Sequence, residues 1–506
     1  MKARIVRACF GSVMALSLAL DAAAADLPKI THDWPCYSGP LGTFADETKT
    51  PLLDDFSQAK LVWKSEDKSI GWGKTTTGDR PSSPREPGLY PSGQGSLIVA
   101  GGMVIAAYFI PSGQVIHKEF ESNPPELRQR GMVMADDVIL AVDAATGKTK
   151  WKQVFAGKGV NCQSGKRPRY GATPAAAQGK VFHIGTTGRI YCVDLVDGKP
   201  LWESFIGTEP PKMIDEQAGK ALVQASSKGN GIRFLLNLVV CDQVLLVPSG
   251  DTLLGFDIAS GKRLWECDGV LSGHNVPSPV KVENQWTLFC VNGKGEMRLM
   301  EAKTGKVFWQ RALSPGFRYT TQSVAADSKA FVWNPGETVV ENGKDRILGK
   351  PACYELKLDG AKLLWELPGK YQHAMGGDGG ESAKIGYRDG RAYFGTTEYA
   401  FVAVNAADGK ILGKLAPKTT SFGSFSLWGD KFVMTGDNSH ESMGWSCSYT
   451  PHTLELAPTG KSYSPRGNQG VSGYIIPMRD PFADGFQFTR TATGQIWCYD
   501  LRAQPQ

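Results

Sequence analysis

The chain has 506 residues, a formal net charge of +6 at pH 7, seven histidines and ten cysteines. The first 25 residues contribute a net charge of +2, and the remaining excess of about four is too small to indicate a nucleic-acid-binding protein. The length alone would allow three domains, but internal repeats favour a single domain over residues 26–506.

The first 25 residues have the pattern of a secretory signal peptide. Lys2, Arg4 and Arg7 precede a short apolar stretch at residues 8–20, and Ala23-Ala24-Ala25 supplies small residues for cleavage. Cys9 stands before most of the apolar stretch, whereas a lipid-anchored cysteine would follow it. We therefore expect a periplasmic or secreted protein without a lipid anchor, and no later stretch is apolar for long enough to predict a transmembrane helix.

A turn ending in Gly-Lys, with a Trp four residues after the Gly, then recurs along the chain. The clear copies are Asp143–Trp151, Asp194–Trp202, Asp257–Trp265 and Glu301–Trp309, and degenerate copies surround Gly360 (with Trp365), Gly409 and Gly460. Each copy follows short apolar segments separated by turns, which is the pattern of an all-β protein built from repeats. A Trp at this position can pack between adjacent sheets.

The copy around Gly198 predicts four strands, at residues 172–177, 181–185, 189–194 and 200–204. Counting such units predicts an eight-bladed β-propeller of four-stranded antiparallel blades. The last unit ends at Asp500 without a fourth strand, while Trp63 stands in an unpaired strand-like segment, Lys60–Lys64. We therefore expect this N-terminal strand to close the ring, since closure removes open sheet edges. Seven blades is the alternative, because the copies at Gly409 and Gly460 lack the Trp.

The connections from the fourth strand of one blade to the first strand of the next should lie together around one mouth of the central channel. They carry a mixture of basic, aromatic and carboxylate side chains, and two insertions, near 110–132 and 209–231, should project on the same side. The candidate ligand-binding residues are Tyr90, Arg169, Asn275, Arg318, Asp378, Arg466 and Asn468. The candidate catalytic residues are His274 and His373 as bases, Tyr170 and Tyr319 as acids, and Glu381, which could pair with Asp378 in a hydrolase.

The arginines suit an anionic ligand such as a uronate polymer, because a guanidinium binds carboxylate groups through two parallel hydrogen bonds. The alternative is that the mouth is simply a hydrated polar surface in which these arginines pair with nearby carboxylates. No metal site is predicted, since neither HExxH nor clustered His and Cys ligands occur. Nine cysteines remain after residue 25, an odd number without a CxxC pair, and their pairing stays open.

The repeat A-x-D-x-x-T-G-K-x-x-W resembles the tryptophan-docking repeat of the pyrroloquinoline quinone (PQQ)-like propellers. This family includes PQQ-dependent alcohol dehydrogenases and the outer-membrane assembly factor BamB. The resemblance covers nearly all of residues 34–502 and implies the fold far more strongly than an activity. As docking residues it implies Trp63, Trp151, Trp202, Trp265, Trp309 and Trp365.

Three functions remain open. The first is a non-catalytic scaffold or binding protein, a monomer that holds a small molecule, a glycan or a protein partner at the propeller mouth. The second is a lyase or hydrolase acting on an acidic glycan with the same residues. The third is a PQQ-dependent dehydrogenase with bound calcium, which we disfavour because many such enzymes carry a vicinal disulfide and this chain has no Cys-Cys pair.

Overall fold

The computed structural model describes the greater part of the chain after residue 26. The described residues are 27–40, 42–70, 95–117, 129–164, 167–168, 172–207, 237–271, 276–313, 323–341, 344–368, 385–396, 401–416, 424–437, 447–464, 480–491 and 494–503. The signal-peptide prediction and the insertion predicted near 209–231 lie outside these residues.

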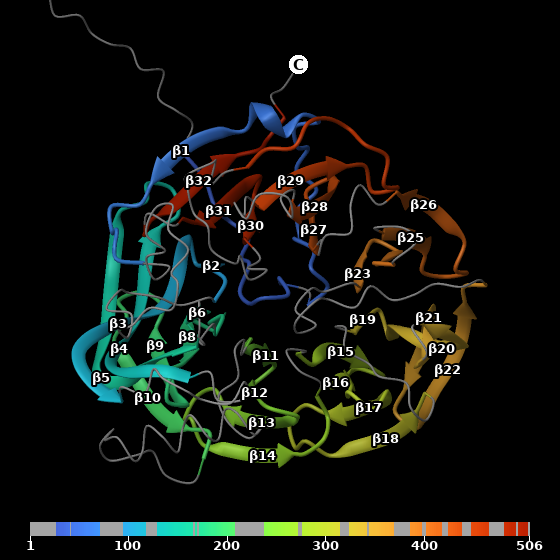
Figure 1. Cartoon of the computed structure of the whole chain (residues 1–506), viewed down its shortest axis with the longest axis horizontal. Helices are drawn as coiled ribbons and strands as arrows, with labels where there is room; N and C mark the ends of the chain where they lie inside the picture. Colours follow the sequence, from blue (N-terminus) through green and yellow to red (C-terminus); the bar gives the residue numbers. More distant parts are fainter. Residues whose placement is uncertain are drawn as a thin grey trace, which may run out of the picture.

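The strands form eight antiparallel sheets arranged around a ring (Figure 1). The prediction of an eight-bladed propeller is confirmed, and the seven-bladed alternative is wrong. Within the described residues six sheets have four strands, blade 1 has a short fifth and blade 7 has three.

The first four blades cover the chain from residue 98 to residue 312. Blade 1 contains β2 (Ile98–Ala100), β3 (Met103–His117), β4 (Gln129–Asp143), β5 (Thr149–Ser164) and β6 (Arg167–Pro168). Blade 2 contains β7 (Ala175–Ala177), β8 (Lys180–Ile184), β9 (Arg189–Asp194) and β10 (Pro200–Phe205). Blade 3 contains β11 (Val239–Cys241), β12 (Val244–Ser249), β13 (Thr252–Asp257) and β14 (Arg263–Cys267). Blade 4 contains β15 (Ser278–Val282), β16 (Gln285–Val291), β17 (Glu296–Glu301) and β18 (Val307–Ala312).

The other four blades complete the ring. Blade 5 contains β19 (Val324–Ala326), β20 (Lys329–Glu341), β21 (Lys344–Lys357) and β22 (Gly360–Glu366). Blade 6 contains β23 (Ile385–Arg388), β24 (Arg391–Phe394), β25 (Phe401–Asn405) and β26 (Ile411–Leu415). Blade 7 contains β27 (Ser424–Trp428), β28 (Lys431–Asp437) and β29 (Cys447–His452). Blade 8 contains β30 (Phe482–Ala483), β31 (Phe486–Arg490), β32 (Ile496–Asp500) and the N-terminal β1 (Lys60–Lys64), which follows the 3-10 helix η1 (Phe56–Gln58).

The ring closes through the N-terminal strand, as the unpaired Trp63 segment predicts. Strand β1 pairs antiparallel with β32, with Lys60 opposite Asp500 and Trp63 opposite Cys498. The last sheet therefore joins segments from the two ends of the chain, and Figure 1 shows the blue β1 beside the red β32. This pairing satisfies the backbone groups along the edge of β32.

Each docking Trp is bound to the following blade and not only to its own. The Trp265 indole donates from Nε1 to the Ala302 carbonyl oxygen at 3.1 Å, and its ring covers Gly305. Gly305 has φ of +72°, and a Cβ placed on it would meet Trp265 ring carbons at 2.6 Å. Glycine is therefore required twice at this position, for the left-handed backbone and for the close approach of the indole. The same contacts join the other clear copies: Trp63 to Gly147, Trp151 to Gly198 and Trp202 to Gly261.

The pairing register of the fourth strand shifts just before the docking Trp. Strand β10 slips between Pro200 and Trp202 against β9, and β14 slips in the same way just before Trp265. A bulge of this kind bends the outer strand and turns the next side chain toward the neighbouring blade.

The seam after blade 6 replaces Trp with glycine. Gly413 occupies the position four residues after Gly409, and the backbone of Glu455 from blade 7 lies directly against it, in the space that a Cβ would need. Backbone contact thus substitutes for the indole at this seam, which explains why the repeat pattern fades in this part of the sequence.

The segment before β1 lies inside the ring. We call residues 33–40 and 42–46 the N-terminal plug. Trp34 forms an isolated bridge with Val99 of β2, the Pro35 carbonyl accepts from Ala176 N of β7, and Ala45 bridges Leu427 of β27. Trp34 and Phe44 are completely buried. Figure 1 shows this blue segment at the centre of the ring, near the first strands of blades on opposite sides.

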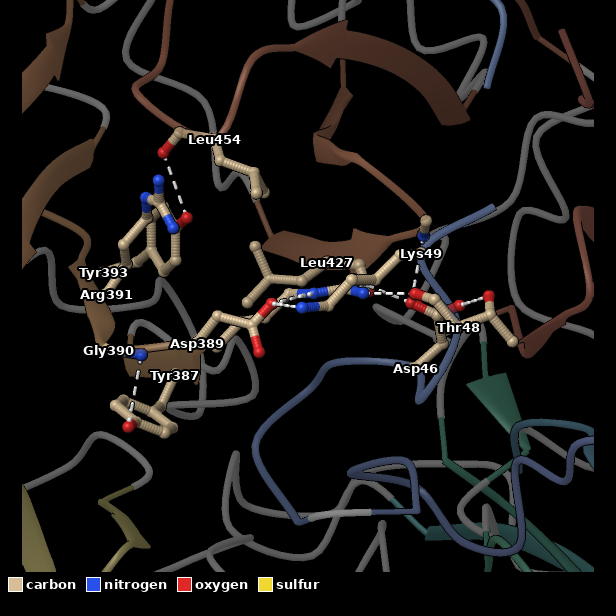
Figure 2. A network of polar contacts seen from close by, with 12 residues as sticks. Asp46, Thr48, Lys49, Tyr387, Asp389, Gly390, Arg391, Tyr393, Leu427 and Leu454 are labelled. Carbon is tan, nitrogen blue, oxygen red and sulfur yellow. Dashed lines mark hydrogen bonds and ion pairs between the residues drawn. The ribbon is translucent and has the colours of Figure 1, made fainter. Parts of the chain in front are cut away.

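A buried ion pair fastens the C-terminal end of the plug. The Arg388 guanidinium lies 2.8 Å from Asp46 Oδ1, which also accepts from Gly429 N at 3.0 Å. Arg388 also donates to the carbonyl oxygens of Thr48 and Leu427. Figure 2 shows Asp46, Thr48 and Leu427 converging in this network between blades 6 and 7. Burial raises the pKa of Asp46, and the adjacent guanidinium opposes that effect.

Candidate functional site

The two ends of the ring differ in how they are built. The first turn and the Gly turn of each blade lie together, because Ala144 N donates to Gly102 O and Leu195 N donates to Gly179 O. We call this side the Gly-turn face. The second turns and the connections between blades lie at the other ends of the strands, and we call that side the mouth. The plug crosses the first strands close to their first turns, so it occupies the Gly-turn end of the ring.

The site residues predicted from sequence lie outside the described residues. This holds for Tyr90, Arg169, Tyr170, His274, Asn275, Arg318, Tyr319, His373, Asp378, Glu381, Arg466 and Asn468. Along the chain, each falls in a segment that leads into the first strand of a blade, for example between β14 and β15 or between β22 and β23. Their roles therefore remain predictions.

Polar side chains at the mouth ends of the first strands were missed by the sequence analysis. We call Ser96, Thr173, Asn237 and Ser278 the inner collar; all four are buried. Each stands five residues before the first positive-φ residue of its blade's first turn, a regularity that could have revealed them.

The inner collar links neighbouring blades. Ser96 N donates to Thr173 Oγ1 at 3.1 Å, and Thr173 forms a parallel bridge with Asn237. Ser278 Oγ accepts from Ala325 N at 3.1 Å. Because these hydrogen bonds join one blade to the next, they hold the starting points of the mouth connections in fixed positions.

A second polar cluster at the mouth belongs to blade 5. Tyr354 OH donates to Asn334 Oδ1 at 2.8 Å, and Asn334 Nδ2 donates to Glu366 Oε2 at 2.8 Å. Lys350 Nζ lies 3.1 Å from Glu366 Oε1. The side chains of Lys350 and Glu366 are each a little over one quarter exposed, so the charged end of this cluster reaches solvent where β22 ends.

The third cluster surrounds an acid between blades 1 and 2. Asp137 is fully buried and accepts hydrogen bonds from Thr186 N, Thr186 Oγ1 and Tyr191 OH at 3.0–3.1 Å. Burial raises its pKa to about 6. Tyr191 stacks on Phe155, with ring centroids 3.8 Å apart.

Comparison with known proteins bears on the repeat and the fold. The family model described as outer membrane protein assembly factor BamB matches residues 56–228 and 135–352, which together are more than half of the chain. The chain belongs to this family of PQQ-like β-propellers. No curated protein sequence matches it significantly.

Two solved structures illustrate the similarity of this PQQ-like propeller to others. BamB from Moraxella catarrhalis is 11% identical, covering 79% of this chain and 99% of its own, with a TM-score of 0.46. A quinohemoprotein alcohol dehydrogenase from Pseudomonas putida HK5 is 11% identical, covering 94% of this chain and 81% of its own, with a TM-score of 0.51. At 11% identity, the similarity to the alcohol dehydrogenase shows the fold alone.

The described part of the propeller contains no group of three or more His, Cys, Asp or Glu side chains placed to hold a metal ion. Its seven free cysteines are Cys36, Cys192, Cys241, Cys267, Cys290, Cys353 and Cys498. Burial raises the pKa of these thiols, which keeps them protonated at neutral pH. Among the described residues no helix is long and apolar enough to span a membrane.

Proposed function

We propose that this protein is a periplasmic or secreted binding propeller that holds an anionic ligand at its mouth without transforming it. The observation that carries the proposal is the position of the N-terminal plug. Because this plug occupies the Gly-turn end of the ring, a ligand of the central channel would approach from the mouth. The predicted ligand-binding residues all fall in segments that lead into the first strands.

The rest of the scaffold supports this assignment. Trp docking and the inner collar hold the blades in one arrangement, so the mouth segments begin from fixed points. Arg169, Arg318 and Arg466 come from three different segments, and their guanidinium groups would suit carboxylate or sulfate groups of an acidic glycan. The family model that matches this chain is described as an assembly factor, which is consistent with binding rather than catalysis.

Binding is tested with the mature protein, residues 26–506, and a panel of acidic and neutral polysaccharides including alginate, polygalacturonate and dextran. We expect an acidic polymer to bind, and the triple variant Arg169→Ala, Arg318→Ala and Arg466→Ala to lose at least about tenfold in affinity. The matched control removes three lysines from the Gly-turn face: Lys148→Ala, Lys199→Ala and Lys262→Ala. Equal losses in both triple variants, or no binding to any acidic polymer, would contradict the proposal.

The same incubations distinguish the glycan-lyase or hydrolase alternative. Oligosaccharides released from a bound polymer and detected by mass spectrometry, and lost in His274→Ala or His373→Ala, would replace binding by catalysis. Binding without released products supports the non-catalytic function.

A further inference from the structure

Asp137 lies where blade 1 extends beyond its neighbours toward the mouth. We call this extension the mouth arm: residues 110–117 of β3, 129–135 of β4 and 156–164 of β5. Strand β5 slips against β4 at this point, since Ala135 pairs with Gly159 but Asp137 pairs with Phe155. Asp136 Oδ1 accepts from Gly157 N within the slipped segment. Bulges of this kind often redirect a strand beside a functional site.

The carboxylate of Asp137 joins the mouth arm to blade 2. Its three donors belong to Thr186, in the second turn of blade 2, and to Tyr191 of β9. Thr186 Oγ1 in turn accepts from Val160 N of the arm at 2.8 Å. One carboxylate and one hydroxyl therefore connect β4, β5 and the turn between β8 and β9.

Two glycines make room for this arrangement. A Cβ on Gly159 would meet Asp137 Oδ1 and Thr186 Oγ1 at 2.7 Å, and a Cβ on Gly185 would collide with the carboxylate. The backbones of both neighbouring segments thus approach the acid closely.

All the hydrogen bonds to Asp137 come from neutral donors. On its own strand Asp136 adds repulsion, and on β8 the buried His183 has a pKa lowered by burial to about 3, so it stays neutral. On β5 Lys158 pairs with Glu203 of β10. On β9, the charge of Arg189 acts on Tyr191, whose pKa it lowers. An ionised carboxylate buried without a direct cation is costly, and such groups cluster at functional positions.

We propose that Asp137 is a pH-sensitive positioning residue that fixes the mouth arm against blade 2 most firmly when it is protonated. Its importance for ligand binding rests on the function proposed above, whereas its effect on the arm does not. Opening the arm would expose the carboxyl group to water, where its pKa returns to an ordinary value of about 4. In the closed arm burial holds that pKa at about 6.

The pKa values of Asp137 in the open and in the closed arm determine the direction in which pH shifts the opening equilibrium. The closed arm keeps its proton up to about pH 6, whereas the open arm releases it near pH 4, so closing takes up a proton between these values. The closed arm is therefore favoured most at acid pH, and this advantage is lost as the pH rises through 6. Between pH 4.5 and 7.5 the opening equilibrium should rise roughly 10- to 100-fold.

Hydrogen exchange of the ligand-free mature protein tests this directly. Mass spectrometry of peptides covering 129–141 and 153–164, corrected for the intrinsic pH dependence of exchange, gives the opening equilibrium of the arm. We expect Asp137→Asn to make it independent of pH. The control Asp136→Asn, which removes only a small repulsion, should keep a pH-dependent profile with its transition at slightly lower pH. A flat profile in the unaltered protein, or an unchanged profile in Asp137→Asn, would overturn the proposal.

Tyr191→Phe provides a second variant in case Asp137→Asn does not fold. It keeps the stacked ring but removes one donor to the carboxylate, so the transition should move to higher pH. An unshifted transition would count against Asp137 as the titrating group. Because no ligand is present, these results stand apart from the binding experiment, and a failure of ligand binding would leave them unaffected.

Discussion

Replacing a docking tryptophan tests whether the indole joins neighbouring blades. Trp265 is 9% exposed, donates to Ala302 O and covers Gly305. Burial of about 200 Å² of its surface corresponds to about 5 kcal/mol at 25 cal/mol per Å², and measured truncations of large aromatic residues cost about 3–5 kcal/mol. We expect Trp265→Ala to lower the free energy of unfolding by about 4 kcal/mol, measured by urea denaturation of the mature protein.

Trp309 offers the matched comparison. Its indole donates to Lys357 O at 2.9 Å, but a Cβ on Gly360, the first residue of β22, would meet no atom within 4 Å. The ring is also only partly buried. Trp309→Ala should therefore cost about 2 kcal/mol, less than Trp265→Ala. Equal losses, or a larger loss for Trp309→Ala, would refute the argument that contact with the Gly turn determines the contribution of each indole.

Three further changes test the seams and the buried charges. Arg388→Met leaves Asp46 buried without its partner and should cost about 3–5 kcal/mol in the same assay, with part of the loss recovered by adding Asp46→Asn; a loss below about 1 kcal/mol would contradict this. Gly413→Ala should lower the thermal midpoint by several degrees, because its Cβ would collide with the Glu455 backbone; an unchanged midpoint would show that the seam can relax. Asp137→Asn should raise the free energy of unfolding at pH 7 by up to about 3 kcal/mol, and this gain should vanish near pH 4, where the native acid is neutral.

The blade pattern could be predicted because its causes are local. Each unit carries its own Gly turn and a Trp a fixed distance later, and Trp63 stands alone where a strand is missing, so eight blades and their closure followed from counting. Where a different contact replaces the docking Trp, as at Gly413, the repeat is harder to recognise in the sequence. The seven-blade alternative arose from these degenerate copies.

The candidate site was only partly open to sequence reasoning. The inner collar consists of single Ser, Thr and Asn residues, which carry no distinctive pattern until the strands are aligned by their turns. In the sequence Asp137 is only the second of two adjacent aspartates before an apolar run, and its partners Thr186 and Tyr191 lie about fifty residues further along. Burial and neighbours determine a pKa, and neither is contained in a local segment.

The amino-acid sequence by itself determined the repeating unit, the fold class and the strand that closes the ring, because turn chemistry and strand alternation act over a few residues. Only the tertiary structure decided that the N-terminal plug occupies the centre of the ring and that Asp46 meets Arg388, more than three hundred residues away. It likewise decided that Asp137 is buried among neutral donors. These features depend on contacts between blades, and such contacts exist only once the ring has closed.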